Sequence, residues 1–263
     1  MSKTIVFIHG AWVTPLCWDQ FIPFFESKGF KCVAPAWPFK DRPIEELRQN
    51  PSAGLATLGV GEIVDHYEKA IRKEDNPLLI GHSFGGLFVQ MLLDRGLGSA
   101  GVAIDPAPPK GVLPFAYPSV LRANLRILAT PGGWAKIIPT SFKDFQYAFV
   151  NNMPEAAQKA AFDKYVIPET GRVFFQTATA LFNDITKVNF NNASRAPLLL
   201  IAGLADTICP AAQIRDNYRH YARSTARTDY REFPDRAHWI IAQPGWEEVA
   251  TSIHDWQAGL PVE

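Results

Sequence analysis

The stretch that decides the fold runs from residue 78 to residue 86 and reads LLIGHSFGG. Its first four residues form an apolar run typical of a buried strand, and an apolar pattern of helical spacing follows Ser83. A serine between a strand and a helix, with Gly81 and Gly85 two residues away on either side, matches the G-x-S-x-G pattern of a sharp turn that exposes a nucleophile. The backbone of such a turn is strained, and the two flanking positions crowd each other, so both must be small. We therefore predict that Ser83 is the catalytic nucleophile.

Short apolar runs recur along the chain, and longer helical patterns lie between them. Runs this short and this rich in Val, Ile and Leu are typical of strands that are buried on both faces. Alternation of strands and helices predicts an α/β fold with a mostly parallel central sheet that is flanked by helices. The expected strands are Thr4–Ile8, Lys31–Pro35, Leu78–Gly81, Gly101–Ile104, Leu198–Ala202 and Thr228–Phe233.

The alternation stops between residues 109 and 190, where helix-compatible stretches are separated by Pro and Gly and no strong strand run occurs. We interpret residues 1–108 as the first part of the core, 109–190 as an inserted helical cap, and 191–263 as the second part of the core. The cap is rich in aromatic side chains, which first of all pack the cap itself and also favour a mainly hydrophobic pocket beneath it. These side chains are Phe115, Tyr117, Trp134, Phe142, Phe145, Tyr147, Phe149, Phe162, Tyr165, Phe174, Phe175 and Phe182.

Composition narrows the classes of partner. The chain has 263 residues, of which 47% are hydrophobic and 20% are charged, which is typical of a globular protein with a large core. Lys and Arg total 26 and Asp and Glu total 26, so the balanced charge gives no indication of binding to nucleic acid or to an anionic membrane. No run of about 18 apolar residues predicts a transmembrane helix. We expect a small-molecule substrate, with the oligomeric state left open.

The cysteines indicate a compartment and no metal site. Cys17, Cys32 and Cys209 are widely spaced, and they form neither a C-x-x-C pair nor a cluster with the spacing of zinc ligands. A sparse and odd number of cysteines suits a reducing cytosol. The first apolar run, residues 5–8, is too short for the hydrophobic part of a signal peptide. The sequence therefore predicts a cytoplasmic protein.

A second motif, HGAW, occupies residues 9–12 at the end of the first expected strand. Gly10 permits the backbone to come close to a ligand. The N–H group of Ala11 is then expected to face developing negative charge together with the N–H group of Phe84, which begins the helix after the nucleophile. We predict that these two N–H groups form an oxyanion hole.

The expected base and acid follow two later strands. Of the six histidines, His238 alone lies on a loop that follows a strand and comes after both Ser83 and the acid candidates. Asp206 follows the Leu198–Ala202 strand, where a buried carboxylate can orient a histidine and stabilise its cation. Asp105 also ends a strand, so it stays open as the alternative acid, although we favour Asp206.

The order Ser, Asp, His, together with the His-Gly loop, resembles the α/β-hydrolase fold family over essentially the whole chain. The resemblance implies a triad of Ser83, His238 and Asp206, a helical cap inserted before the strand that carries the acid, and no cofactor. Two features depart from well-known members. The loop at residues 34–38 reads APAWP, in place of the Asp-x-x-Gly-x-Gly pattern of many capped esterases. Trp239 stands where hydroxynitrile lyases of this fold carry Lys.

These features predict a serine hydrolase that cleaves a small-to-medium, mainly hydrophobic carboxylic ester or lactone through an acyl-enzyme. Trp12 and Trp37, on loops that follow strands, are expected to line the substrate pocket. Other reactions use the same triad, so a carbon–carbon bond hydrolase, a thioesterase, a perhydrolase and a ligand receptor with slow turnover stay open as alternatives. A serine nucleophile argues against haloalkane dehalogenases and epoxide hydrolases, which use Asp.

Overall fold

A parallel sheet of six strands forms the centre of the computed structural model, which describes residues 3–113 and 116–261. Every neighbouring pair of strands in this sheet is parallel, which confirms the predicted fold class. In spatial order the strands are β2 (Lys31–Val33), β1 (Thr4–Ile8), β3 (Leu78–His82), β4 (Ala100–Ile104), β7 (Leu198–Gly203) and β8 (Thr228–Phe233). Each expected strand is present. Strand β2 ends at Val33, two residues earlier than expected. Pro35, just beyond it, has no N–H group to donate to a neighbouring strand.

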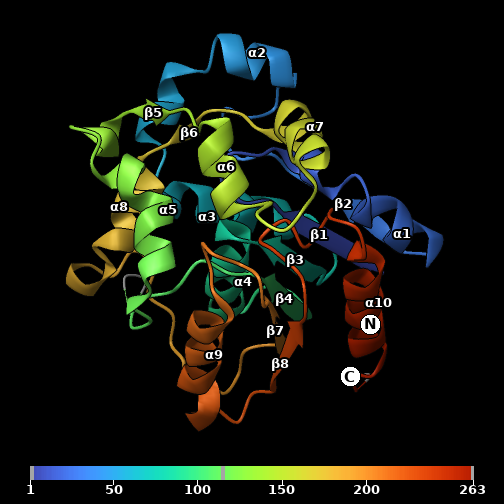
Figure 1. The fold of residues 1–263 in the computed structure, drawn as a ribbon. Helices are drawn as coiled ribbons and strands as arrows, with labels where there is room; N and C mark the ends of the chain where they lie inside the picture. Colours follow the sequence, from blue (N-terminus) through green and yellow to red (C-terminus); the bar gives the residue numbers. More distant parts are fainter. Residues whose placement is uncertain (1–2, 114–115, 262–263) are drawn as a thin grey trace.

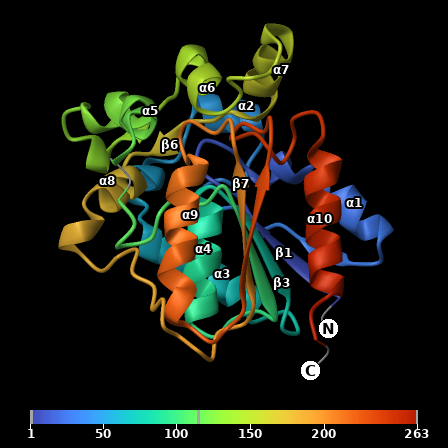
Figure 2. The same ribbon diagram turned by 60° about the horizontal axis from the view of Figure 1, so that its bottom comes forward.

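Helices cover both faces of the sheet, as Figure 2 shows. One face carries α3 (Val60–Ile71), α4 (Phe84–Asp94) and α9 (Ala211–His220), and the other carries α1 (Phe21–Ser27) and α10 (Trp246–Ala258). The strands β3, β4 and β7 are buried at every position, so the apolar runs in the sequence reflect contact with helices on both sides. Helix α4 is buried from Phe84 to Leu93, because it packs against β3 and β4 of the sheet and also contacts α3.

We refer to residues 109–190 as the insertion. Its helices and short strands lie over the carboxyl ends of the sheet strands, together with the short helix α2 (Ile44–Gln49) (Figure 1). Its elements are α5 (Pro118–Leu128), η4 (Gly133–Ala135), β5 (Ile137–Ile138), α6 (Phe142–Ala148), α7 (Glu155–Tyr165), β6 (Glu169–Thr170), α8 (Arg172–Ala178) and η5 (Ala180–Phe182). The antiparallel pair β5–β6 was not expected, because two residues are too few to produce an alternating pattern. The boundaries given for the cap stay a prediction, and Phe115 lies outside the described residues.

A helix that crosses a membrane needs about 20 consecutive, mainly apolar residues. Among the residues that the structure describes, none of the helices is both long enough and apolar enough to span a bilayer.

The start of α4 lies unusually close to β1 and β3. A Cβ atom added to Gly85 would lie 1.9 Å from the carbonyl oxygen of Ile8, and one added to Gly81 would lie 2.1 Å from the carbonyl oxygen of Gly85. Both distances are far below van der Waals contact with rigid backbone atoms. The two glycines of the G-x-S-x-G pattern are therefore required by packing between strand and helix.

This contact generates a prediction about stability. We expect Gly85→Ala to lower the free energy of unfolding by about 3 kcal/mol or more, because the new methyl group must push α4 away from β1. Urea denaturation followed by circular dichroism measures the change. Gly61→Ala is the control: a Cβ added to Gly61, in α3, meets nothing within 4 Å. It should stabilise the protein by about 0.5–1 kcal/mol. Equal stability of Gly85→Ala and the wild type would contradict the packing argument.

Candidate active site

Ser83 occupies a strained turn between β3 and α4. Its backbone dihedrals are φ 59° and ψ −122°, a region that residues other than glycine rarely adopt. Hydrogen bonds hold the turn on both sides: the Ser83 N–H donates to the carbonyl of Ile104 at 3.0 Å, and the Ser83 carbonyl accepts from Gly86 at 2.9 Å and from Ala107 at 3.0 Å. Strain of this kind costs about 1–3 kcal/mol and persists where the surroundings enforce it. The side chain is thereby presented at the end of the sheet.

Ala11 and Phe84 line the same cavity as Ser83. Within the described residues, neither Ala11 nor Phe84 donates its N–H to a protein acceptor. Phe84 is the first residue of α4, where N–H groups are left unpaired and the helix dipole is positive. The loop after β1 reaches Ser83 closely, since a Cβ added to Gly10 would lie 2.7 Å from Ser83 Cβ and 3.3 Å from its Oγ. The structure thus brings the two residues of the predicted oxyanion hole close to Ser83.

His238 and Asp206 form a fully buried pair. The Nδ1 atom of His238 lies 2.6 Å from Oδ2 of Asp206, and both side chains are inaccessible to solvent. The other carboxylate oxygen, Oδ1, accepts the N–H groups of Ile208 and Cys209 at 2.8 Å each. Because an ionised carboxylate can only accept, Nδ1 of a neutral His238 ring is the protonated nitrogen. Its Nε2 then carries a lone pair, and this atom is buried without a hydrogen-bond partner among the described residues.

Ser83 and His238 are not joined by a hydrogen bond in the described structure. Across the described part of the chain, neither Ser83 Oγ nor His238 Nε2 takes part in a hydrogen bond. Contacts of this kind are often long in the absence of a substrate and tighten when one binds. His82, the neighbour of Ser83, has its ring centroid 4.6 Å from that of His238, so the pair lies beside the Ser83 turn.

His82 links the turn to the loop that carries His238. Its Nε2 donates to the carbonyl oxygen of His238 at 2.7 Å, so Nε2 carries the proton. Burial lowers the pKa of the His82 ring well below its ordinary value, and His238 lowers it further. His82 is therefore a neutral residue that holds the His238 backbone. No local pattern in the sequence indicates this contact, because the partner lies 156 residues away.

Asp105 lies beside the pair and makes a different contact. Its Oδ1 accepts the N–H of Gly203 at 2.7 Å, while Oδ2 has no hydrogen-bond partner in the described structure. Burial raises the pKa of the Asp105 carboxyl well above its ordinary value, and the nearby Asp206 raises it further. These conditions favour a neutral carboxylic acid, whereas the orienting bond to His238 comes from Asp206. The geometry therefore favours Asp206 over Asp105 as the acid partner of His238.

The same side chains offer two sets of donor atoms for a metal ion. The ligand atoms of His82, Asp105 and His238 lie within 4.8 Å of one another, as do those of Asp206, Cys209 and His238. Both Asp206 oxygens already accept hydrogen bonds. Burial raises the pKa of the Cys209 thiol well above its ordinary value, which disfavours the thiolate that binds metals. The donor chemistry therefore fits a hydrogen-bonded site better than a metal centre.

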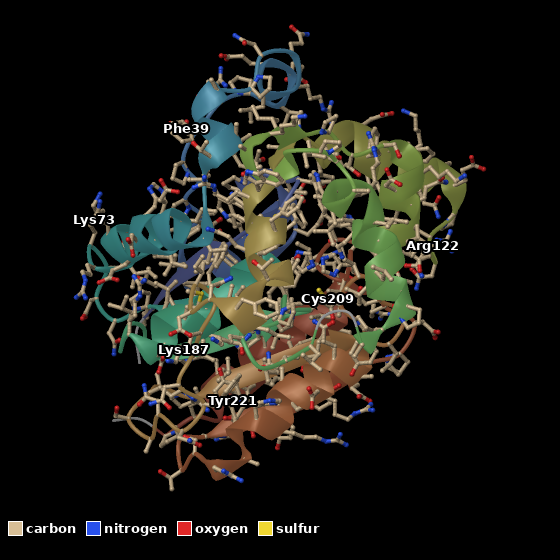
Figure 3. The ribbon with its side chains drawn as sticks, turned by 90° about the vertical axis from the view of Figure 1, so that its left-hand side faces the viewer. Phe39, Lys73, Arg122, Lys187, Cys209 and Tyr221 are labelled. Atoms are coloured by element: carbon tan, nitrogen blue, oxygen red, sulfur yellow. The ribbon has the colours of Figure 1, made fainter. Side chains whose placement is uncertain are left out.

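A small apolar cavity opens in front of Ser83, with a volume of about 50 Å³. Figure 3 views the molecule from the side on which Cys209, one of its wall residues, lies between α5 and α8. Trp12 lines this cavity, as expected. The other lining residues are Ala11, Ser83, Phe84, Ala107, Pro108, Val120, Asn124, Leu128, Phe174, Thr177, Ala178, Ile208 and Cys209.

The geometry does not support Trp37 as a pocket residue. Its side chain is fully buried and stacks on the ring of His9, with centroids 5.1 Å apart. The indole Nε1 donates to the His9 carbonyl at 3.1 Å, and the Trp37 N–H donates to His9 Nε2 at the same distance. The loop after β2 therefore turns inward beneath the β1 loop, away from the cavity, and Trp37 supports that loop from below.

The insertion forms hydrogen bonds with the loops that carry Asp206 and His238. Asn151 Nδ2 donates to the carbonyl of Ala205 at 3.0 Å, and Thr207 Oγ1 donates to the carbonyl of Tyr147 at 2.6 Å. The N–H of Trp239 donates to the carbonyl of Phe149 at 2.9 Å, and the Phe149 ring meets the His238 ring edge-on at 4.8 Å. Residues 147–151 thus fix two of the loops from which the site is built.

Comparison with known proteins agrees with this architecture. Residues 5–251 match the model of the alpha/beta hydrolase family. A search of curated proteins gave no match. Among solved structures, the chain is similar to a monoacylglycerol lipase from Paleococcus ferrophilus, with 23% identity and a TM-score of 0.66 over 96% of this chain and 93% of that one.

An extracellular alpha/beta-hydrolase from a Paenibacillus species has 18% identity and a TM-score of 0.68, with 96% of this chain and 98% of that one covered. A methylesterase from Arabidopsis has 14% identity and a TM-score of 0.68, with 98% and 99% covered. At these identities the likeness concerns the fold, while the family model covers nearly the whole sequence. The chain therefore belongs to the alpha/beta hydrolase family.

Proposed function

We propose that this protein is a serine hydrolase that cleaves a small-to-medium, mainly hydrophobic carboxylic ester or lactone through an acyl-enzyme at Ser83. One observation carries the proposal: Ser83 shares an apolar cavity with Ala11 and Phe84, whose N–H groups have no acceptor in the described part of the protein. Unpaired N–H donors beside a nucleophile have a clear chemical use, because they can stabilise an oxyanion that forms during acyl transfer.

The proposed chemistry assigns one role to each group. Nε2 of His238 takes the proton from Ser83 Oγ, which attacks the carbonyl carbon of the substrate. The N–H groups of Ala11 and Phe84 bind the oxyanion, and Asp206 stabilises the imidazolium ion of His238. His238 then protonates the leaving alkoxide. Water, deprotonated by His238, releases the acyl group and restores Ser83.

The cavity and its surroundings support an apolar substrate. Its polar lining is limited, since Asn124 Nδ2 donates to the carbonyl of Val120 and Thr177 Oγ1 donates to that of Val173. A second cavity of about 310 Å³ shares Thr177 and Ala178 with the first, which leaves room for a medium-sized substituent. The names of two similar structures, a monoacylglycerol lipase and a methylesterase, are those of ester hydrolases and support an ester as substrate.

The first test is the dependence of hydrolysis on Ser83. We expect Ser83→Ala to lower kcat for p-nitrophenyl esters by roughly a million-fold, because it removes the nucleophile. Release of p-nitrophenol measures the rate, and Ser27→Ala, an exposed serine on α1, is the control. Ester hydrolysis that survives in Ser83→Ala would exclude the proposal. The wild type and Ser83→Ala should also be compared on lactones, thioesters and β-diketones. This comparison distinguishes the alternative reactions of the same triad.

The second test separates the two acids. We expect Asp206→Asn to lower kcat by about 10⁴-fold, because the amide disfavours the required tautomer of His238. Asp105→Asn should stay within about tenfold of the wild type, because a neutral amide resembles the neutral acid expected at that position. Steady-state hydrolysis of p-nitrophenyl butyrate measures both. The reverse order of effects would identify Asp105 as the acid that acts on His238.

The third test concerns Ala178, which lines both cavities. We expect Ala178→Phe to lower kcat/KM for p-nitrophenyl hexanoate about tenfold or more, because the ring fills the space between the cavities. Hydrolysis of the acetate should change by less than about threefold, since the acetyl group fits in front of Ser83. Equal losses on both esters would show that the longer chain does not pass Ala178.

A further inference from the structure

The loop after β1 has its own strained residue. Trp12 adopts φ +62°, a left-handed conformation that is rare for a bulky side chain and that persists only where neighbours impose it. Both of its backbone groups are bonded to the insertion. The Trp12 N–H donates to Oε2 of Glu169 at 2.9 Å, and the Trp12 carbonyl accepts from Ile167 at 2.8 Å. The residue next to Ala11 is thus held by a segment more than 150 positions away.

Glu169 is a buried carboxylate that accepts three hydrogen bonds. Besides Trp12, its Oε2 accepts a hydrogen bond from Nζ of Lys40, and its Oε1 accepts the N–H of Thr170 at 2.8 Å. The side chains of Lys40 and Glu169 are both inaccessible to solvent. Lys40 Nζ also donates to the carbonyl of Val13 at 3.3 Å and lies over the ring of Trp37, 4.1 Å from its centroid.

These contacts place an ion pair immediately behind the proposed oxyanion hole. Burial lowers the pKa of the Lys40 ammonium, while the charge of Glu169 raises it again. Because charges interact strongly in a buried environment, a carboxylate beside this loop would oppose an oxyanion forming near Ala11. The Lys40 charge compensates for it. The carboxylate can therefore hold Trp12 without penalising the reaction.

We propose that Glu169 and Lys40 are positioning residues for the oxyanion hole, in which Glu169 holds the Ala11–Trp12 turn through the Trp12 N–H and Lys40 neutralises its charge. The inference rests on the proposed function, since it takes the Ala11 N–H as an oxyanion donor. The bond to Glu169 fixes the peptide that follows Ala11. It also removes the Trp12 N–H as a competing donor and leaves the Ala11 N–H facing the cavity.

Two double variants that remove both charges of this pair test the bond to Trp12. Lys40→Met with Glu169→Gln keeps an acceptor for the Trp12 N–H, whereas Lys40→Met with Glu169→Leu keeps the size and removes the acceptor. Replacing a buried ion pair by neutral groups of similar volume often leaves stability unchanged, so both variants should fold. We expect the Gln variant to stay within about fivefold of wild-type kcat and the Leu variant to fall about 10- to 100-fold, with KM within about threefold for both.

Lys40→Met alone tests the compensating charge. It leaves Glu169 unpaired next to the loop, so we expect kcat to fall about tenfold or more and to recover when Glu169→Gln is added. A trifluoromethyl ketone, which adds to the serine to give a tetrahedral oxyanion, should lose affinity in parallel with kcat. If Lys40 had only a structural role, the variant would have a lower midpoint of thermal unfolding, and its affinity for the ketone would not fall together with kcat.

Arg48→Met is the matched control. Arg48, on α2, donates to the carbonyls of Phe162, Asp163 and Val166 in the insertion, and within the described residues it forms no hydrogen bond with Trp12. Its loss loosens the same part of the insertion, and kcat should stay within about threefold of the wild type. Equal kcat in the Gln and Leu variants, or an equal fall in Arg48→Met, would overturn the inference.

Ser83→Ala, measured in parallel, separates this inference from the proposed function. Hydrolysis that persists in Ser83→Ala removes the proposed function and the inference with it. Hydrolysis that depends on Ser83 but is the same in the Gln and Leu variants removes the inference alone. The rate at which a fluorophosphonate labels Ser83 gives a second readout that needs no turnover, and we expect it to follow the order of the kcat values.

Discussion

At Gly85 the backbone of α4 comes so close to the Ile8 carbonyl that no Cβ atom fits between them. This contact sets the position of the helix start relative to β1, and with it the distance between the Ser83 turn and the loop at Gly10. If α4 moved outward by the width of a methyl group, Phe84 at its start would move away from Ala11 on the loop after β1. Interiors packed at crystal-like density transmit such shifts, so one steric contact governs the geometry of the site.

Several buried ionisable groups surround the site, and their hydrogen bonds and neighbouring charges differ. Both oxygens of Asp206 accept hydrogen bonds, from two backbone N–H groups and from His238. Asp105 has a raised pKa because it is buried beside Asp206, so it is suited to be neutral. Glu169 is charged and paired with Lys40. The fold thus holds three buried carboxyl groups in three electrostatic environments, which is the usual way in which a protein assigns them different tasks.

The sequence predicted the sheet and the sharp turn at Ser83 well, because both depend on local patterns: apolar runs for the strands and two glycines around Ser83. It did not separate Asp206 from Asp105, since both follow a strand and only the paths of the loops decide which carboxylate meets His238. Trp37 was assigned to the pocket because it follows a strand, but its loop turns inward under His9. Glu169 could not be found from sequence, because its partners Trp12 and Lys40 lie 157 and 129 positions away and share no motif with it.

The atoms proposed to carry out the chemistry belong to loops of the core, whereas many hydrogen bonds that orient those loops come from residues 147–169 of the insertion. The parts of a protein that open first are those with the smallest local free energy of unfolding. An opening confined to the insertion would disorganise the site while the sheet stayed intact. Heat inactivation of this protein would then be a local and reversible event, and a chimaera that received another insertion would work only if the new segment restored these long-range bonds.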